Sequence, residues 1–390
     1  MKKTRIAITI IFIAFMGLVS GISLITPDRK FSPNENRYLA EPPGISTDDI
    51  LSGTFQNNLE DYLKDQLCFR DGWITVKTGI QKLCGNTDIG GAYVGKDGYD
   101  FEKITPEDVD DKLVDRNIRA VSDFFEETSA SIGKEHVSFL LVPTSGLVME
   151  DRLPKNARLF DQAAYIDRVE DAMKDYSFID VRGELKEHNK EYLYYRTDHH
   201  WTTDGAYIAY EKWCSSTGRT CPDKAELKQN TVTDKFRGSL YSKILDADSA
   251  YDSIWTYGLT EKEAFGSTGC KVTIDNKRTM DTCYDEKKLE EKDKYAYFFG
   301  GNYGEVHIEN TDKTGDKGKL LVIKDSFANS FVPFLVNDYD DIYMVDLRYY
   351  NGDMAEYLKE NQITDVLVLY NISNFISDRN LYKLSGGRLG

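Results

Sequence analysis

The amino-acid sequence predicts an α/β protein with a parallel, buried central sheet. Three apolar runs in the last third of the chain have the length and composition of buried strands: Lys319–Ile323 (KLLVI), Asp341–Leu347 (DIYMVDL) and Asp365–Tyr370 (DVLVLY). The segments between them, Ala328–Val336 and Asp353–Asn361, have helical character. Strands and helices that alternate at this spacing form right-handed βαβ units. We therefore expect three layers, with helices on both faces of the sheet.

The first half of the body supplies further elements of the same kind. Thr105 followed by Pro106 and two acidic residues has the pattern of a helix start, and it predicts a helix that runs to about Ser131. His136–Val142 is an apolar run that predicts a buried strand. The elements expected next are a helix at Tyr165–Tyr176, a short strand at Phe178–Val181 and a helix capped by Thr202 or Thr203.

The sequence divides into three predicted regions. Residues 1–25 form a short basic stub and an uncharged stretch, IAITIIFIAFMGLVSGISLI, which is long enough to cross a bilayer because a spanning helix needs about 20 apolar residues. Residues 26–90 are a linker and an amphipathic helical segment, and residues 91–390 are the α/β body. Within the body, residues 222–318 consist of short charged segments and are expected to form a β-rich insertion.

The N-terminal stretch also predicts a location. Because Lys2, Lys3 and Arg5 precede it, the basic end stays in the cytoplasm and the rest of the chain lies outside. Small residues at Gly17, Ser20 and Gly21 leave cleavage as a signal peptide open, but the length of the apolar run favours a retained anchor.

Composition excludes one class of partner and suggests a redox state. The 390-residue chain has a formal net charge of −16, which argues against nucleic-acid binding. An exported protein can hold disulfides. The simplest connectivity pairs each cysteine with its neighbour in the sequence, and the alternative is that the cysteines are reduced, buried thiols. The six cysteines concerned fall in close pairs along the chain: Cys68 and Cys84, Cys214 and Cys221, Cys270 and Cys283.

Polar residues follow each of the three late strands. Ser326 follows the first, Arg348 the second and Asn371 the third, so all three are expected at one edge of a parallel sheet, where ligands bind. Ser326 stands where a strand turns into a helix, and the N–H groups of a new helix favour a developing oxyanion. Asn371 can add a side-chain donor to that oxyanion. Ser326 can also be a simple helix cap.

A base for this serine is offered by Thr197-Asp198-His199-His200-Trp201. The Asp-x-His spacing lets Asp198 orient the imidazole of His200 and stabilise its charged form, as a catalytic triad requires. Alternation along an extended segment predicts that His199 points the other way; it is grouped with Trp201, Asn371 and Arg348 as a residue around the substrate. Two alternatives stay open: a metal site completed by His307 or Asp204, and Ser145 as a rival nucleophile.

These motifs resemble a known family. YRTDHHWTTDGAYIAY is similar to the signature of the DHHW protein family, and KLLVIKDSFANSFVPFL, DLRYYN, VLVLYN, FSPNENRYLAEPP and DQLCFRD resemble its other blocks. That family resembles the alginate O-acetyltransferases and, more distantly, the SGNH hydrolases. The resemblance implies an SGNH-like fold with a permuted order, in which the Asp-x-His pair precedes the serine, and it implies a triad of Asp198, His200 and Ser326. Arg348 matches an arginine of the acetyltransferase site loosely, and Asn371 stands at the oxyanion asparagine.

The resemblance also implies a role. We expect an O-acetyltransferase that acts on an exopolysaccharide or cell-wall polymer outside the membrane through an acyl-enzyme at Ser326, with a membrane-bound O-acyltransferase as acyl supplier. No cofactor or metal is expected. Two other functions stay open: a carbohydrate acetyl esterase that uses the same triad with water, and a non-catalytic scaffold for polymer modification.

Overall fold

The computed structural model describes residues 2–35, 37–260, 263–312 and 315–385, and these form two compact units. The first unit comprises Met1–Gly90 with Tyr241–Ser249, and the second comprises Gly91–Leu240 with Ala250–Gly390. Parts of the predicted regions lie outside the described residues, namely Met1 of the stub, Asn36 of the linker, residues 261–262 and 313–314 of the predicted insertion, and the last five residues of the body.

The first unit is built from helices. Its elements are α1 (Lys2–Ile25), β1 (Phe31–Ser32), β2 (Arg37–Tyr38), α2 (Thr47–Ser52), α3 (Thr54–Asp65), α4 (Arg70–Leu83) and β3 (Asp88–Ile89). Within α1, Lys3–Ile25 is long and apolar enough to cross a membrane, with a mean hydropathy of 2.5, and can be a signal anchor or a signal sequence. The linker packs on α3, because Arg37 donates from Nη1 to Asp65 Oδ2 at 2.8 Å.

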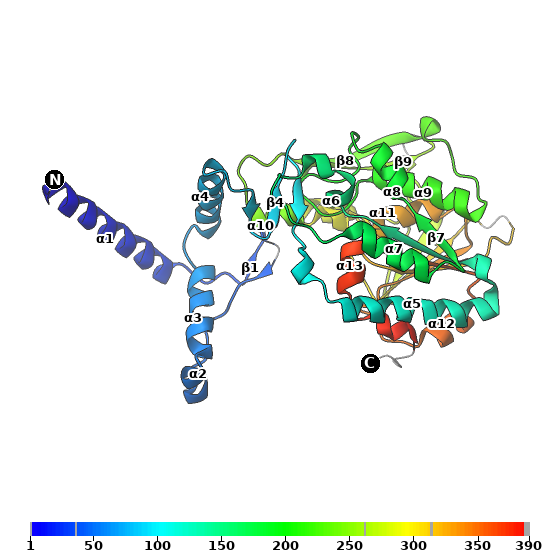
Figure 1. Ribbon diagram of the computed structural model, residues 1–390, viewed down its shortest axis with the longest axis horizontal. Coiled ribbons are helices and arrows are strands. Elements are labelled where there is room, and N and C mark those ends of the chain that lie inside the picture. Colours follow the sequence, from blue (N-terminus) through cyan, green and yellow to red (C-terminus); the bar gives the residue numbers. More distant parts are fainter. Residues whose placement is uncertain (1, 36, 261–262, 313–314, 386–390) are drawn as a thin grey trace. The chain divides into compact units, whose positions relative to one another are not determined.

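The second unit is an α/β body around one mixed sheet (Figure 1). In the described residues this sheet has eight strands in the order β11-β10-β12-β14-β13-β15-β6-β7. The strands are β6 (Val137–Val142), β7 (Ser177–Asp180), β10 (Cys270–Ile274), β11 (Arg278–Met280), β12 (Glu305–Asn310), β13 (Lys319–Lys324), β14 (Asp341–Val345) and β15 (Asp365–Asn371). Strands β14, β13, β15, β6 and β7 are parallel to one another, as the apolar runs predict.

The sheet is not wholly parallel, which corrects the sequence prediction. Strands β12, β10 and β11 extend it from β14 in antiparallel pairing, with Ile308 opposite Ile342. They come from the region predicted as an insertion. Buried and half-exposed residues alternate along β12, which is the pattern of a strand with one covered face. The other strands of that region, β8 (Lys228–Phe236) and β9 (Asp252–Gly258), form a separate two-stranded antiparallel sheet.

Helices cover both faces of the five parallel strands, so the body has three layers. One apolar cluster joins Leu320 and Leu367 to α9 (Thr203–Thr217) and α11 (Ala328–Phe331), and the other joins Leu321 and Val368 to the helices of the opposite face. Those helices are α5 (Asp111–Ile132), α7 (Gln162–Ala172), α12 (Met354–Asn361) and α13 (Ile372–Ser377). Strands buried on both faces need continuous apolar runs, which explains the sequence pattern.

The remaining elements are short. They are β4 (Ala92–Val94), β5 (Asp100–Glu102), α6 (Ser145–Val148), α8 (Arg182–Glu187) and α10 (Ser239–Ile244), with 3-10 turns at Pro106–Asp108, Lys134–His136, Glu150–Arg152, Lys224–Glu226, Glu286–Glu290, Lys294–Tyr297, Val332–Leu335 and Leu381–Ser385. Two predicted helices are broken by such turns. Thr105 caps a 3-10 turn while α5 starts at its own cap, Asp110, and α11 gives way to a 3-10 turn that contains Pro333.

The cysteine prediction is wrong, because all six cysteines are free thiols. Cys270 contacts Cys283, and both residues are buried. The Cys270 thiol donates to the Gly266 carbonyl at 3.5 Å. Cys68 donates instead to the Val19 carbonyl, while Cys84 is exposed.

Candidate functional site

The turn after β13 carries Ser326 and is fixed by the carboxylate next to it. Asp325 accepts hydrogen bonds from the backbone N–H of Phe327 at 2.8 Å, the backbone N–H of Asn371 at 2.8 Å and the side chain of Asn374 at 2.7 Å. Burial raises the pKa of Asp325. Its contacts tie the end of β13 to the end of β15, so Ser326 is held rigidly with its side chain in place. The backbone N–H of Ser326 has no acceptor among the described residues.

Asp198, His200 and Ser326 lie in one hydrogen-bonded line. Asp198 Oδ1 is 2.6 Å from His200 Nδ1, and His200 Nε2 is 2.7 Å from Ser326 Oγ. All three residues are almost fully buried. Because the carboxylate accepts a hydrogen bond from Nδ1–H, Nε2 is the free acceptor and the serine hydroxyl donates to it.

The protonation states suit this arrangement. Burial lowers the pKa of His200 to about 4, helped by His199 and opposed by Asp198, so the imidazole is neutral at pH 7. Burial by itself raises the pKa of Asp198, but the neighbouring imidazoles of His200 and His199 outweigh it and hold the pKa well below its ordinary value. The pair is therefore a carboxylate beside a neutral base.

The loop that carries Asp198 and His200 is a tight excursion between paired segments. Tyr194 bridges Trp201, and the N–H of Thr202 donates to the Leu193 carbonyl at 2.8 Å, so residues 196–200 form bends at the tip. Asp252 of β9 holds this tip in place, because it accepts hydrogen bonds from the hydroxyl of Thr197 at 2.6 Å and from the Thr197 N–H at 2.8 Å.

Two further residues close around Asp198. The N–H of Ser239 donates to Asp198 Oδ2 at 2.7 Å. Gly238 precedes it, and a Cβ at this position would lie 2.1 Å from the same carboxylate oxygen. Only glycine therefore allows the chain to approach Asp198 this closely. Sequence reasoning missed both residues because they lie about forty positions away.

Tyr295 is a further residue that sequence reasoning missed. Its ring stacks on the imidazole of His200, with centroids 3.8 Å apart and planes 12° apart. Its hydroxyl donates to the Ser326 carbonyl at 3.1 Å and lies 3.2 Å from Ser330 Oγ. Tyr295 thus touches both the base and the serine turn. Nothing local marks it among the 25 tyrosines of the chain.

His199 and Trp201 are placed differently from the prediction. His199 lies beside His200 with ring centroids 3.9 Å apart, because the segment bends and is not extended. Its Nδ1 is 2.7 Å from Ser239 Oγ. Trp201 is completely buried, and its Nε1 donates to the Phe327 carbonyl and to Ser330 at 3.0 Å each. A buried indole with its N–H engaged braces the loop against α11 and does not face a substrate.

Asn371 and Arg348 lie at the predicted sheet edge but make contacts of their own. Asn371 donates its side-chain N–H groups to the carbonyls of Val142 at 3.2 Å and Pro143 at 3.3 Å, so both amide hydrogens are used between strand ends. Arg348 donates from Nε to Asp346 at 2.9 Å. It lines a cavity of about 280 Å³ together with Asp325, Tyr370, Asn374, Ser377, Asp378, Arg379 and Asn380.

A buried lysine organises two amides beside the serine turn. Lys324 donates from Nζ to Asn302 Oδ1 and to Asn329 Oδ1, each at 2.7 Å. Asn329 donates to the same Asn302 oxygen at 3.2 Å, so that oxygen faces the lysine. The amide nitrogen of Asn302 has no acceptor in the part of the chain that the structure describes. The Gly-Gly-Asn sequence at 300–302 was the one local signal for this residue.

The open alternatives can now be located. Asp198, His199 and His200 form a group whose ligand atoms lie within 4.8 Å of one another, so they can hold a metal ion. The proposed third ligands are elsewhere: His307 contacts Asp341 at 2.7 Å, and Asp204 accepts from Tyr257 at 2.6 Å. Ser145, the rival nucleophile, starts the short helix α6 after β6 and is buried.

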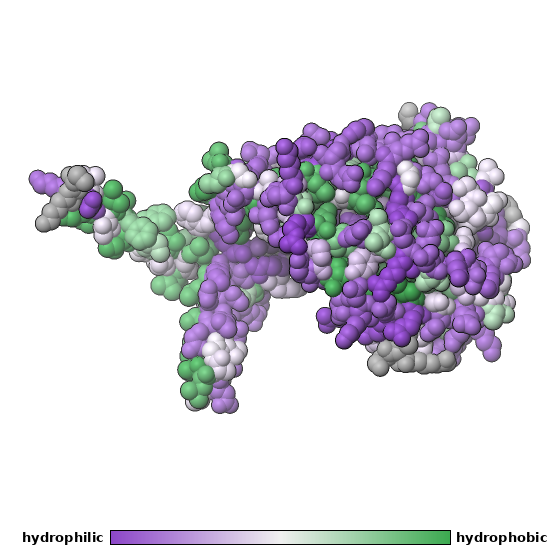
Figure 2. All heavy atoms as spheres, in the orientation of Figure 1, coloured by the Kyte–Doolittle hydropathy of each residue, from purple (hydrophilic) through white to green (hydrophobic). Residues whose placement is uncertain are grey.

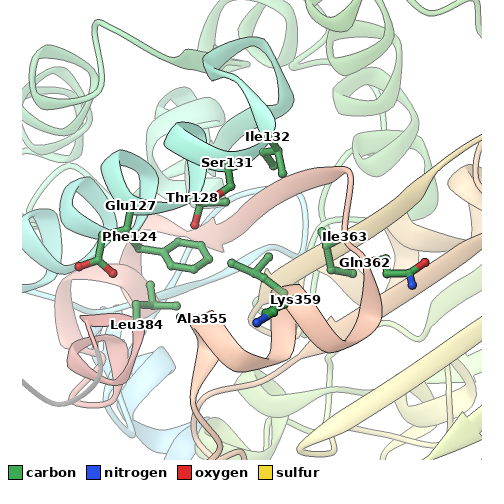
Figure 3. A pocket seen from close by; sticks show the side chains of 11 residues that line it. Phe124, Glu127, Thr128, Ser131, Ile132, Ala355, Lys359, Gln362, Ile363 and Leu384 are labelled. Atoms are coloured by element: carbon green, nitrogen blue, oxygen red, sulfur yellow. The ribbon is translucent and has the colours of Figure 1, made fainter.

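A separate cavity lies on the other face of the sheet (Figure 3). It has a volume of about 380 Å³ and is enclosed by α5, α12 and the turn at Leu384. Phe124 and Ile363 give it an apolar wall, and Glu127 and Lys359 stand at its rim. None of its lining residues belongs to the Asp198–His200–Ser326 group.

Fold and site together define an α/β protein with a buried Ser-His-Asp line at the edge of its sheet. The sequence profile of the DHHW protein family matches residues 161–345, a region that contains all three residues, so the resemblance read from TDHHWT is confirmed. No curated protein matches the sequence.

Several solved structures are similar to this chain. A DHHW family protein from Eubacterium siraeum has 22% identity and a TM-score of 0.62, with 76% of this chain and 95% of that chain covered. PatB1 from Bacillus cereus, solved with a sulfonyl adduct, has 23% identity and a TM-score of 0.58, with 71% and 93% covered. The O-acetyltransferase domain of Pseudomonas putida AlgJ has 13% identity and a TM-score of 0.48, with 76% and 99% covered.

Proposed function

We propose that this protein is an extracytoplasmic serine-dependent acyltransferase that O-acetylates a carbohydrate polymer. The observation that carries the proposal is the line Asp198–His200–Ser326, with 2.6 Å and 2.7 Å between its members. A neutral imidazole whose Nε2 accepts the serine hydroxyl, and whose Nδ1 is held by a carboxylate, is the arrangement that activates a serine. The resemblance to O-acetyltransferases supports acetyl as the transferred group.

The reaction proceeds in two steps. Ser326 Oγ attacks the carbonyl of an acetyl donor while His200 Nε2 takes the hydroxyl proton, and the donor leaves with that proton, so an acetyl ester remains on Ser326. A sugar hydroxyl then attacks this ester as His200 takes its proton. The ester bond to Ser326 breaks, and the proton returns to Oγ.

Each step passes through an oxyanion that needs hydrogen-bond donors. The Ser326 N–H is free for this purpose. We place the amide of Asn302 beside it, because Lys324 and Asn329 fix the Asn302 oxygen and leave its nitrogen turned away from them. This replaces Asn371, whose amide hydrogens are engaged. Arg348, at the cavity beside Asp325, is proposed to contact the acceptor.

The location and partners of the protein belong to the same proposal. Helix α1 anchors the chain, the residues after it lie outside the cytoplasm, and a membrane-bound O-acyltransferase delivers acyl groups across the bilayer. The apolar character of Lys3–Ile25 and the basic residues before it support this orientation. Sequencing the N-terminus of the mature protein tests retention: a start after residue 17 would mean a cleaved signal sequence.

The test of the chemistry is capture of the acyl-enzyme. The full chain in detergent is incubated with p-nitrophenyl acetate, and intact-mass and peptide analysis locate the acetyl group. We expect acetyl on Ser326 and a loss of turnover on the order of 10³-fold in Ser326→Ala. Ser145→Ala is the matched control, since Ser145 is also a buried serine after a parallel strand. Because PatB1 forms a sulfonyl adduct, a sulfonyl fluoride supplies an independent trap.

Adding oligosaccharide divides the possible outcomes. Acetylated sugar supports transfer, whereas free acetate at an unchanged rate, with no acetylated sugar, makes the protein an esterase. Acetyl found on Ser145, or turnover unchanged in Ser326→Ala, contradicts the proposed nucleophile. If neither reagent labels the chain and polymer acetylation in cells survives Ser326→Ala, the protein is a scaffold.

A further inference from the structure

Helix α4 of the first unit carries an apolar stripe that is largely exposed among the described residues. Phe69 is the residue directly before the helix, and Trp73, Val76, Ile80 and Leu83 recur at intervals of three and four residues, which places these four on one side of the helix. Their exposed fractions are 74%, 37%, 54%, 56% and 90%. Hydrophobic side chains stand at the surface of both α1 and α4 (Figure 2). Contiguous exposed apolar surface of this kind marks an interaction site.

The opposite side of α4 is already in use. Arg70 pairs with Glu35, and Thr78 donates to the Ile244 carbonyl at 2.6 Å. Lys82 lies 2.5 Å from Asp246. These three residues fall on one face, about half a helical turn away from the stripe. The first unit therefore holds α4 by its polar face and leaves the apolar face turned outward.

The contacts at the start of α4 indicate what covers the stripe. The N–H of Cys68 donates to Ser23 Oγ at 3.0 Å, and the ring of Trp73 packs edge-on against Phe15 with centroids 5.8 Å apart. Ser23 and Phe15 belong to the C-terminal half of α1, which the basic N-terminus assigns to the outer leaflet. The stripe thus begins against the outer half of the membrane-spanning helix itself.

We propose that α4 is an interfacial helix whose stripe lies in the outer leaflet of the bilayer that α1 spans. A helix with an apolar stripe containing Trp and a polar opposite face binds membranes in this way. The proposal rests on the membrane location given under the proposed function, but it does not depend on the acyl chemistry. It adds a second membrane contact to the anchor.

The tryptophans of the chain make the test direct. Trp201, Trp213 and Trp255 are buried in the second unit, so Trp73 is the one that lipid can reach. The full chain is reconstituted in phosphatidylcholine vesicles with and without brominated acyl chains, which quench tryptophan on contact. The emission of Trp73 is the difference between the native protein and Trp73→Phe. We expect brominated lipid to reduce this emission to less than half, and we expect the same quenching in Trp213→Phe.

A stripe variant separates specific burial from general proximity. Ile80→Asp places a charge in the stripe at an exposed position, so the fold survives while quenching of Trp73 is lost. Gln81→Asp adds the same charge beside the stripe and keeps the quenching. Alkaline extraction of the vesicles reports insertion of α1 independently. Retained α1 with no quenching of Trp73, or equal quenching in Ile80→Asp, overturns the proposal and leaves both the anchor and the acyl chemistry untouched.

A second copy of the chain is the competing occupant. Cys84 is exposed and directly follows Leu83, so pairing of two α4 stripes brings two Cys84 thiols together. Oxidative cross-linking that gives dimers in the vesicles, combined with no quenching by brominated lipid, means that the stripe is a dimer contact and contradicts the proposal.

Discussion

His200 owes its properties to the side chains that surround it. Burial lowers its pKa to about 4, and His199 acts in the same direction, while Asp198 opposes both. Tyr295 stacks on one face of the ring, which fixes the plane in which Nε2 meets Ser326. The result is a base that stays neutral across the physiological range and is aimed at one hydroxyl.

The pH dependence of turnover follows from this pKa. Activity requires neutral His200, so kcat/KM for ester turnover should fall below a midpoint of about pH 4 and not near 6.5. In His199→Gln one cause of the lowered pKa is gone, and the midpoint should move to higher pH. Profiles of both proteins, with His188→Gln as an exposed-histidine control, check the shift. An unmoved or lowered midpoint in His199→Gln would show that His199 does not act on the base.

Tyr295 is a positioning residue that can be tested with a matched pair. Tyr295→Phe keeps the stacked ring, whereas Tyr295→Leu removes it, and an aromatic pair contributes about 1 kcal/mol beyond its burial. We therefore expect Leu to lower kcat about 5-fold with KM unchanged, and Phe to stay within about 2-fold of the native protein. Circular dichroism controls for folding. Equal losses in both variants would assign the role to the hydroxyl.

At the scale of elements, the site depends on a bent loop that is held by hydrogen bonds from two other segments. Residues 196–200 form the tip of an excursion between paired segments, and Asp252 and the Gly238-Ser239 backbone hold it. The loop fixes Asp198 and His200 together, while the β13 turn independently fixes Ser326 through Asp325. Two rigid elements, more than a hundred residues apart, thus meet in hydrogen-bond contact.

Substitution of Gly238 is the most specific test of the contacts that hold this loop. In Gly238→Ala the new Cβ would lie 2.1 Å from Asp198 Oδ2, so the carboxylate or the chain has to move. We expect a loss of about 1–3 kcal/mol in the free energy of unfolding, typical of overpacking, and a fall in turnover larger than the fall in stability explains. Gly183→Ala is the control, because a Cβ there meets nothing within 4 Å. Denaturant melts measure the free energy of unfolding, and kcat/KM measures turnover. Native turnover in Gly238→Ala would show that the close approach of the chain to Asp198 is not needed for activity.

At the scale of the whole molecule, the second unit is a three-layer body that buries titratable groups at one sheet edge. Burial lowers the pKa of His200 and raises that of Asp325. These shifts have opposite effects on stability. A histidine with a lowered folded pKa takes up its proton on unfolding, whereas a carboxyl with a raised pKa releases its proton on unfolding.

A comparison of two proteins measures the contribution of His200 together with its effect on Asp198. Between pH 6.5 and about 4 the unfolded state binds more protons at this histidine, so the free energy of unfolding falls as pH drops through that window. The shift corresponds to at most about 3 kcal/mol. In His200→Gln this loss should be absent, while the contribution of Asp325 is common to both chains. Urea melts at pH 7 and at pH 4.5 measure the difference, and identical pH dependence in the two proteins would contradict it.

The sequence by itself determined the parallel core of the sheet, because strands buried on both faces require continuous apolar runs. It also determined that Ser326, Arg348 and Asn371 share an edge, since the carboxyl ends of parallel strands meet there, and it marked Asp198 and His200 by their spacing. The sequence did not predict the antiparallel extension β12-β10-β11, because weakly alternating charged segments do not indicate which strands they pair with.

Only the tertiary structure decided what lies around the triad. Tyr295, Gly238 and Asp252 reach the site from loops and strands distant in the chain, and no local pattern records such contacts. The structure likewise turned Trp201 and Asn371 inward and left the cysteines as thiols. Local sequence fixes which chemistry a segment can offer, but the direction of a side chain and its neighbours depend on long-range packing, which is a property of the folded chain as a whole.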